Sequence, residues 1–274
     1  MELQIGDYVT RNSYNNDIIF KITDINGENV ELIGFSVRLI ADSNINDLVK
    51  CDIKREVLEE EELIERVKND KLDDRSDYFY LPGKILHIDG DLEYLNKCMK
   101  YYKSINLMAM GICEEESKVP FKIQELLEEY NPSILVITGH DAYYKKRGNI
   151  NDINAYKNSK NFVNAVNEAR KYEKSHEKLI IIAGACQSDY EELIKAGANF
   201  ASSPKRINIH ALDPAIIASS MSLSDINQDI DLKEIINKTK YGKEGMGGII
   251  TKGTMYRGYP RWRSMKLKKI FVII

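Results

Sequence analysis

Several features that would direct this chain to a particular partner or compartment are scarce in its sequence. No run approaches the eighteen or so apolar residues of a membrane helix. The 39 basic and 42 acidic side chains give a net charge of −3, too small to attract nucleic acid or lipid over a long range. The amino terminus lacks a charged segment followed by an apolar one. We therefore expect no nucleic-acid or membrane partner, and a protein that works in the cytoplasm of its cell.

Cysteine is also scarce. The chain has four cysteines, and they show neither the paired spacing of a metal site nor a secretory context. The sequence predicts four free thiols, with no metal and no other cofactor. These cysteines are Cys51, Cys98, Cys113 and Cys186.

Composition along the chain predicts one large domain with a small appendage. Residues 1–48 hold short apolar strands separated by Asn-Asn and Asn-Gly turn signals, which predict a small SH3-like β-barrel unit. Residues 49–79 are rich in charge and predict a linker, and residues 261–274 form a basic and apolar tail. Residues 80–260 form the main domain. The strands expected in the first unit cover residues 8–10, 18–22, 30–34 and 36–41.

In the main domain, apolar strands alternate with amphipathic helical segments. Runs of β-branched residues four or five long are typical of strands buried on both faces of a parallel sheet. The sequence therefore predicts an α/β fold with a parallel sheet flanked by helices. The expected strands cover residues 84–89, 106–112, 134–138, 179–183 and 199–201.

Two of these strands run directly into a reactive side chain. His140 follows the strand 134–138, and Cys186 follows the strand 179–183. Open α/β sheets place their ligands at the carboxyl ends of strands, and the 46 positions between the two residues leave room for one loop and one crossover helix. We expect His140 and Cys186 to share one edge of the sheet as general base and nucleophile.

The residues after Cys186 predict a helix whose amino-terminal end would favour ionisation of the thiol. Ser188 and Glu191 have the spacing of a capping box, which would start a helix beside Cys186. The N–H groups and the dipole at that helix end would favour a thiolate and hold an oxyanion.

Two other interpretations use different residues or no chemistry. His210 also follows an expected strand and would serve as the base in a nucleophile-elbow cysteine hydrolase or amidotransferase, although Ser188 replaces the last glycine of that motif. His87 and His176 are expected in the core and on a solvated helix end. A non-catalytic scaffold that binds through the amino-terminal unit is the third possibility.

Charged groups elsewhere allow more than one interpretation. Asp89 and Asp91 predict a turn followed by a helix cap, and they also suit a metal or the orientation of a base. Lys205, Arg206 and the basic residues of 261–269 predict solvated surface or cleavage sites for a protease with a basic preference.

Longer stretches of the chain resemble a known family. The order of histidine and cysteine, each after an apolar strand, resembles the caspase-like (clan CD) cysteine peptidases, including gingipains. Over residues 3–260 the chain resembles, more closely, the YabG family of sporulation-specific proteases. The segments that carry this resemblance are Ile5–Arg11, Val37–Asp42, Leu81–Asp91, Ile137–Tyr143, Ala183–Ser188 and Phe200–Pro214.

The resemblance implies a caspase-like and gingipain-like fold and an endopeptidase of the mother cell. Such an enzyme would process spore coat and related spore proteins after arginine, would associate with the coat, and would also cut itself. It implies His140 as general base and Cys186 as nucleophile. A preference for arginine needs an acidic pocket, for which Asp141, Asp189 and Asp213 are the candidates.

The chain departs from the expected pattern in two places. Clan CD peptidases generally have glycine after the catalytic histidine, where its N–H helps to hold the oxyanion, and this chain has Asp141 there. The residues after Pro260 do not match the family.

Overall fold

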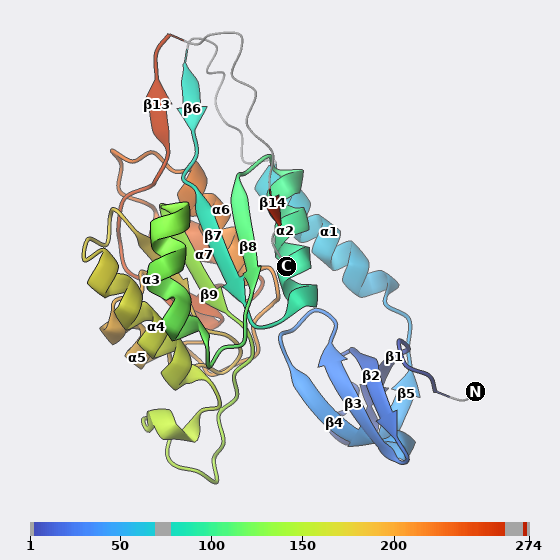
Figure 1. The fold of residues 1–274 in the computed structure, drawn as a ribbon. Helices are drawn as coiled ribbons and strands as arrows, with labels where there is room; N and C mark the ends of the chain where they lie inside the picture. The colour runs from blue at the N-terminus through green and yellow to red at the C-terminus, as the bar shows by residue number, and fades with distance from the viewer. Residues whose placement is uncertain (1–2, 69–77, 261–270, 273–274) are drawn as a thin grey trace.

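The computed structural model describes residues 3–68, 78–260 and 271–272. It contains a five-stranded antiparallel sheet near the amino terminus, a seven-stranded sheet, and a two-stranded ribbon (Figure 1). Within these described ranges, no helix is both long and apolar enough to cross a bilayer. The basic part of the predicted tail, 261–270, lies outside the described residues, as do residues 69–77 of the predicted linker.

The amino-terminal unit is an antiparallel sheet with the strand order β4-β3-β2-β1-β5. A small apolar core, which includes Val9, Phe20 and Leu32, is fully buried on it. Gly27 has a φ of +64° in the turn after β2, a conformation that tight hairpin turns require and glycine adopts without strain. The strands are β1 (Tyr8–Arg11), β2 (Phe20–Asn26), β3 (Asn29–Gly34), β4 (Ile40–Asn44) and β5 (Leu48–Lys50). The SH3-like closure of this sheet stays a prediction.

One expected strand of this unit is displaced. The sequence predicts a strand over residues 36–41, but β4 begins at Ile40, and the preceding residues leave the sheet as a loop. Val37 is 8% exposed and Arg38 is completely buried, because this loop enters the main domain. Alternation of apolar residues indicates burial, but it does not tell which domain provides the contact.

The main sheet has the strand order β12-β11-β10-β9-β7-β8-β14. All neighbours from β11 to β14 pair in parallel, and β12 pairs antiparallel with β11 at the edge. The predicted parallel sheet with flanking helices is therefore confirmed. Its strands are β7 (Ile85–Asp89), β8 (Ala109–Cys113), β9 (Ile134–Thr138), β10 (Ile180–Ala183), β11 (Phe200–Ser202), β12 (Met246–Gly248) and β14 (Phe271–Val272).

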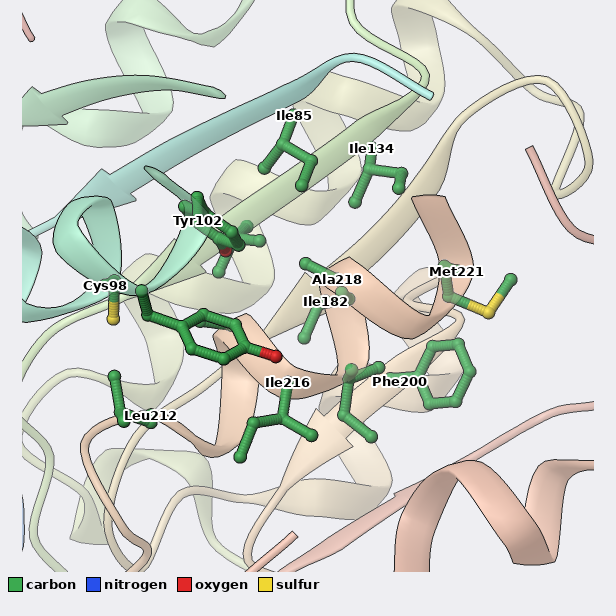
Figure 2. Close-up of a cluster of buried hydrophobic side chains, with 14 of the residues drawn as sticks. Ile85, Cys98, Tyr102, Ile134, Ile182, Phe200, Leu212, Ile216, Ala218 and Met221 are labelled. Atoms are coloured by element: carbon green, nitrogen blue, oxygen red, sulfur yellow. The ribbon is translucent and has the colours of Figure 1, made fainter. Parts of the chain in front are cut away.

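Helices cover both faces of this sheet (Figure 1). One apolar cluster packs α3 (Val119–Tyr130), α4 (Ser159–Tyr172) and α5 (Tyr190–Ala196) against one face. The cluster on the opposite face joins the strands to α2, α6 and α7, and Figure 2 shows part of it, with side chains from α2, the central strands and α6. Because both faces are filled, the ends of the strands are the places left for a site. The helices of the second face are α2 (Leu92–Ser104), α6 (Asp213–Leu223) and α7 (Leu232–Asn237).

One helix and a two-stranded ribbon lie outside the two larger sheets. Helix α1 (Lys54–Lys68) lies in the predicted linker and forms ion pairs from Glu59 to Lys240 and from Glu60 to Lys97. Strands β6 (Phe79–Leu81) and β13 (Tyr256–Gly258) pair as a separate antiparallel ribbon.

Candidate functional site

The structure brings the two predicted catalytic residues to the same edge of the main sheet. Strands β9 and β10 are parallel neighbours, with Ile137 opposite Ala183, so the predicted adjacency is confirmed. His140 and Cys186 follow these strands within three residues of their ends. Among the described residues, no hydrogen bond joins the two side chains, so the catalytic roles stay predictions.

The imidazole of His140 is oriented by a carboxylate. Its Nε2 lies 3.1 Å from Asp91 Oδ2, and its ring lies 5.6 Å from the ring of Tyr94. Its Nδ1 is buried and has no hydrogen-bond partner among the described residues. A carboxylate at Nε2 favours the tautomer with its proton there, and this leaves the Nδ1 lone pair available to accept a proton.

Asp91 caps a helix, as predicted, and also contacts His140. Its Oδ1 accepts hydrogen bonds from the N–H groups of Glu93 and Tyr94 and so caps α2, while its Oδ2 holds His140. Burial raises the pKa of Asp91, but the hydrogen bonds from His140 and Tyr94 outweigh it and the net pKa is lowered. The helix cap and the contact to His140 therefore share one side chain. In the described part of the chain, no group of side chains is arranged to hold a metal ion.

Polar side chains also hold the main chain of His140 in place. Its N–H donates to Glu116 Oε1 at 2.8 Å, and its carbonyl oxygen accepts from Asn158 Nδ2 at 2.8 Å. A Cβ atom on Gly139 would lie 2.4 Å from Glu116 Oε1, so the close approach of this carboxylate requires glycine. Sequence reasoning missed Glu116 because it lies in a turn 24 positions away, with no motif around it.

Cys186 has different surroundings. Its side chain is completely buried, and Sγ accepts a hydrogen bond from the Ile209 N–H at 3.3 Å. The Arg38 main-chain N–H also contacts this sulfur. Burial raises the pKa of Cys186 to about 12, although both N–H groups act to lower it. The thiol is therefore neutral at physiological pH in this arrangement.

The predicted capping box beside Cys186 is wrong. Helix α5 is capped by Asp189, which accepts from the Glu192 N–H, and its first residue is Tyr190. Ser188 instead donates to Asp141 Oδ2 at 2.8 Å. The helix therefore starts four residues after Cys186, and its N–H groups do not ionise the thiol. Ser188 lies within the turn, and its partner Asp141 comes from the end of β9, 47 positions away, which local spacing does not reveal.

The three acids considered for an arginine pocket are already engaged to different degrees. Asp141 accepts hydrogen bonds from Ser159 Oγ at 2.5 Å and Ser188 Oγ at 2.8 Å, and burial raises its pKa. Asp213 accepts from the main-chain N–H of His210 and of Lys240.

The third acid, Asp189, forms an ion pair with Arg206 at 3.2 Å. Its other oxygen, Oδ2, is buried and lacks a partner among the described residues. Asp189 is therefore the one of the three with an oxygen left to engage.

The other three histidines are buried or partly buried. His210 is 3% exposed, its Nδ1 accepts from the Leu212 N–H at 3.2 Å, and burial lowers its pKa to about 3. His87 is completely buried, as predicted, and its Nδ1 lies 3.0 Å from the Tyr102 hydroxyl. His176 follows α4 in a partly buried turn.

A buried ion pair near Cys186 was missed by sequence reasoning. Arg38 Nη1 lies 2.6 Å from Asp89 Oδ2, and both side chains are completely buried. Burial raises the pKa of Asp89, but the Arg38 guanidinium and His87 outweigh it and lower the net pKa to about 2. The two partners come from different units, 51 positions apart, and only the folded chain brings them together.

Comparison with known proteins places this arrangement in a family. A family model described as YabG peptidase U57 matches residues 4–260. The chain belongs to this family. The sporulation-specific protease YabG of Bacillus subtilis (strain 168) is 43% identical over 286 residues, covering 95% of this chain and 99% of the relative. No solved structure matches. The expected membership of the YabG family is confirmed, and it makes the chain a peptidase.

Proposed function

We propose that this protein is a cysteine endopeptidase of sporulation in which Cys186 is the nucleophile and His140 the general base. The observation that carries the proposal is the shared edge of β9 and β10, where Asp91 orients His140 and leaves its Nδ1 free. Membership of a peptidase family and the similarity to a sporulation-specific protease support the reaction and its setting.

The reaction follows from these groups. His140 Nδ1 takes the proton of the Cys186 thiol, and the thiolate adds to the scissile carbonyl carbon. The tetrahedral intermediate then expels the amine, which receives the proton from His140, and an acyl-enzyme remains. Water, deprotonated by His140, hydrolyses this thioester and restores the thiol. No cofactor enters any step.

Main-chain N–H groups are the proposed donors to the oxyanion. The N–H groups of Asp141 and Cys186 donate to no main-chain acceptor among the described residues. Clan CD peptidases generally have glycine where this chain has Asp141. The Asp141 carboxylate is bound by Ser159 and Ser188, so the side chain points into the fold and away from the main-chain N–H. Replacement of glycine by Asp141 therefore leaves the N–H for this role.

The proposed substrates are spore coat and related spore proteins, cut after basic residues and arginine above all. The proposed site of action is the mother-cell cytoplasm and the coat, with self-cleavage as a further reaction of the same kind. The similarity to a sporulation-specific protease supports this setting.

Replacement of Cys186 tests the mechanism. In Cys186→Ala, cleavage of an arginyl peptide should fall by about 10³-fold or more, because the nucleophile is lost. Cys113→Ala is the control, since it removes a different thiol, one that is only partly buried, and should keep activity. Unchanged cleavage by a folded Cys186→Ala protein would reject the mechanism. An arginyl electrophile that labels Cys186 in the folded wild type would separate the enzyme from a scaffold.

A further inference from the structure

A loop of the amino-terminal unit lies beside Cys186. It connects β3 to β4 and spans Phe35–Leu39. Val37 pairs antiparallel with His210, and Ser36 O accepts from the Ala211 N–H at 3.0 Å. The loop thus adds a short extended segment to the stretch that follows Ile209, the residue whose N–H contacts the thiol. Extended peptides bind to many proteins by this kind of strand addition.

The loop inserts an arginine into a closed polar pocket of the main domain. The Arg38 guanidinium contacts Asp89 Oδ2 at 2.6 Å, Ala211 O at 3.0 Å and Cys98 Sγ at 3.6 Å. Its carbon lies 5.1 Å from the centre of the Tyr94 ring. A carboxylate, a carbonyl and an aromatic face are the partners that a guanidinium prefers.

The same residue lies next to the proposed nucleophile. The Arg38 main-chain N–H contacts the Cys186 thiol while its guanidinium lies in the pocket. The Tyr94 hydroxyl lies 2.6 Å from Gly34 O and 2.8 Å from Val37 O, within hydrogen-bond distance of both, and its ring packs beside His140. The loop is therefore held on the proposed dyad by main-chain contacts that any extended peptide offers.

We propose that this pocket is the subsite for the arginine side chain of a substrate, that Asp89 is its acid, and that the Arg38 loop occupies it as an internal inhibitor. The inference rests on the proposed peptidase function. It assigns the specificity of the site to Asp89 and its regulation to the amino-terminal unit.

The geometry accounts for a closed site. A tethered loop has an effective concentration in the millimolar range, so it competes with any arginine of a free substrate. The thiol is completely buried, so a scissile carbonyl cannot reach it in this arrangement, and withdrawal of the adjacent loop is the proposed way to open it. Withdrawal of the loop leaves the buried Asp89 carboxylate without its guanidinium, and an incoming arginine restores the pair.

Thiol labelling in the absence of substrate tests the inhibitor. Arg38→Ala should raise the rate of Cys186 alkylation by iodoacetamide by about tenfold or more, measured by peptide mapping with Cys51 and Cys113 as internal references. Lys21→Ala is the matched control, because it breaks the exposed 2.7 Å ion pair to Glu93 in α2 and leaves the pocket filled. An unchanged rate in a folded Arg38→Ala protein would overturn the inference.

A milder variant tests whether the loop covers Cys186 if Arg38→Ala does not fold. Tyr94→Phe removes the hydroxyl that holds two carbonyl groups of the loop and leaves no buried charge unpaired. Faster Cys186 labelling in Tyr94→Phe would support the loop as a cover, and wild-type labelling would contradict it.

A small ligand tests the pocket itself. Ethylguanidinium should raise the melting temperature of Arg38→Ala by several degrees and slow its Cys186 labelling, with no effect on wild type. The double variant Arg38→Ala/Asp89→Asn should lose this response. It should also lose the preference for arginine over glutamine before the scissile bond, by about 100-fold, whereas Arg38→Ala/Asp189→Asn should keep it.

These readouts separate the two proposals. Exposure of Cys186 without cleavage of any peptide would reject the peptidase mechanism and leave the occupied pocket intact. Loss of arginine preference in Arg38→Ala/Asp189→Asn, with the preference retained in Arg38→Ala/Asp89→Asn, would assign the subsite to Asp189 and overturn the inference.

Discussion

The ends of β9 and β10 differ in what surrounds their reactive residues. At the β9 end, the side chains of Asp91, Glu116 and Asn158 hold His140 and leave one ring nitrogen open. At the β10 end, Cys186 contacts main-chain groups and is completely buried. The proposed base is thus already oriented, whereas the proposed nucleophile is neutral and completely buried. The difference places the control of activity on the cysteine side of the site.

The variant that removes the proposed base, His140, should have the largest effect. His140→Ala should lower kcat/KM for an arginyl peptide by about 10²–10⁴-fold, since both proton transfers lose their carrier. His210→Gln should cost far less, because Nδ1 of His210 already accepts from the Leu212 N–H. Steady-state kinetics on both proteins measures the difference. A larger loss in folded His210→Gln would transfer the role to His210 and support the nucleophile-elbow alternative.

Removal of the orienting carboxylate should have a smaller effect. Asp91→Asn should lower kcat by about 10–10³-fold with little change in KM, because the neutral amide no longer selects one tautomer of His140. Asparagine caps helices as well as aspartate does, so the melting temperature should stay near that of wild type. A loss of stability that matches the loss of activity would show that Asp91 acts through the cap alone.

Two buried groups that follow Ile209, namely His210 and Asp213, should make the folding stability depend on pH. Burial lowers the pKa of His210 to about 3, so its unfolded state takes up a proton first and stability falls as pH drops below 6.5. Burial raises the pKa of Asp213 to about 7, so its folded state keeps a proton and stability falls as pH rises above 3.8. The two effects oppose each other between about pH 4 and 6.5.

Single variants should separate these slopes. In His210→Gln only the Asp213 effect remains, so the free energy of unfolding should fall by about 1.4 kcal/mol per pH unit as pH rises through this window. In Asp213→Asn only the His210 effect remains, so the free energy of unfolding should rise by about the same amount. Urea unfolding at pH 4.5 and 6.5 measures the unfolding free energy of both. Slopes of the same sign in the two variants would contradict the burial of one of these groups.

The smallest effect on activity is expected at Glu116, which holds the main chain of His140. Glu116→Gln replaces a carboxylate that accepts the His140 N–H with a neutral amide oxygen, which should cost about 1 kcal/mol in activation free energy, or about fivefold in kcat. Glu115→Gln is the control, since Glu115 is exposed on the same turn. Equal rates in Glu116→Gln and wild type would show that other contacts suffice to hold this turn.

Local patterns in the sequence predicted the strands and their neighbours because β-branched runs report burial on both faces. They placed His140 and Cys186 at one edge for the same reason. They failed where a residue has two possible partners, as Ser188 bonds to Asp141 in place of its helix. They also failed for Arg38, which looks like an outward position of a strand until Asp89 from another unit is placed beside it.

The position of the Arg38 loop along the chain gives the covered site a property in time. Arg38 precedes Cys186 by 148 positions, so ribosomes complete the amino-terminal unit before they add the nucleophile. The Arg38 loop is therefore synthesised before Cys186. In a protease assembled in this order, the proposed inhibitor is synthesised before the thiol that it covers, and the covered arrangement is completed when Ile209 and Ala211 follow.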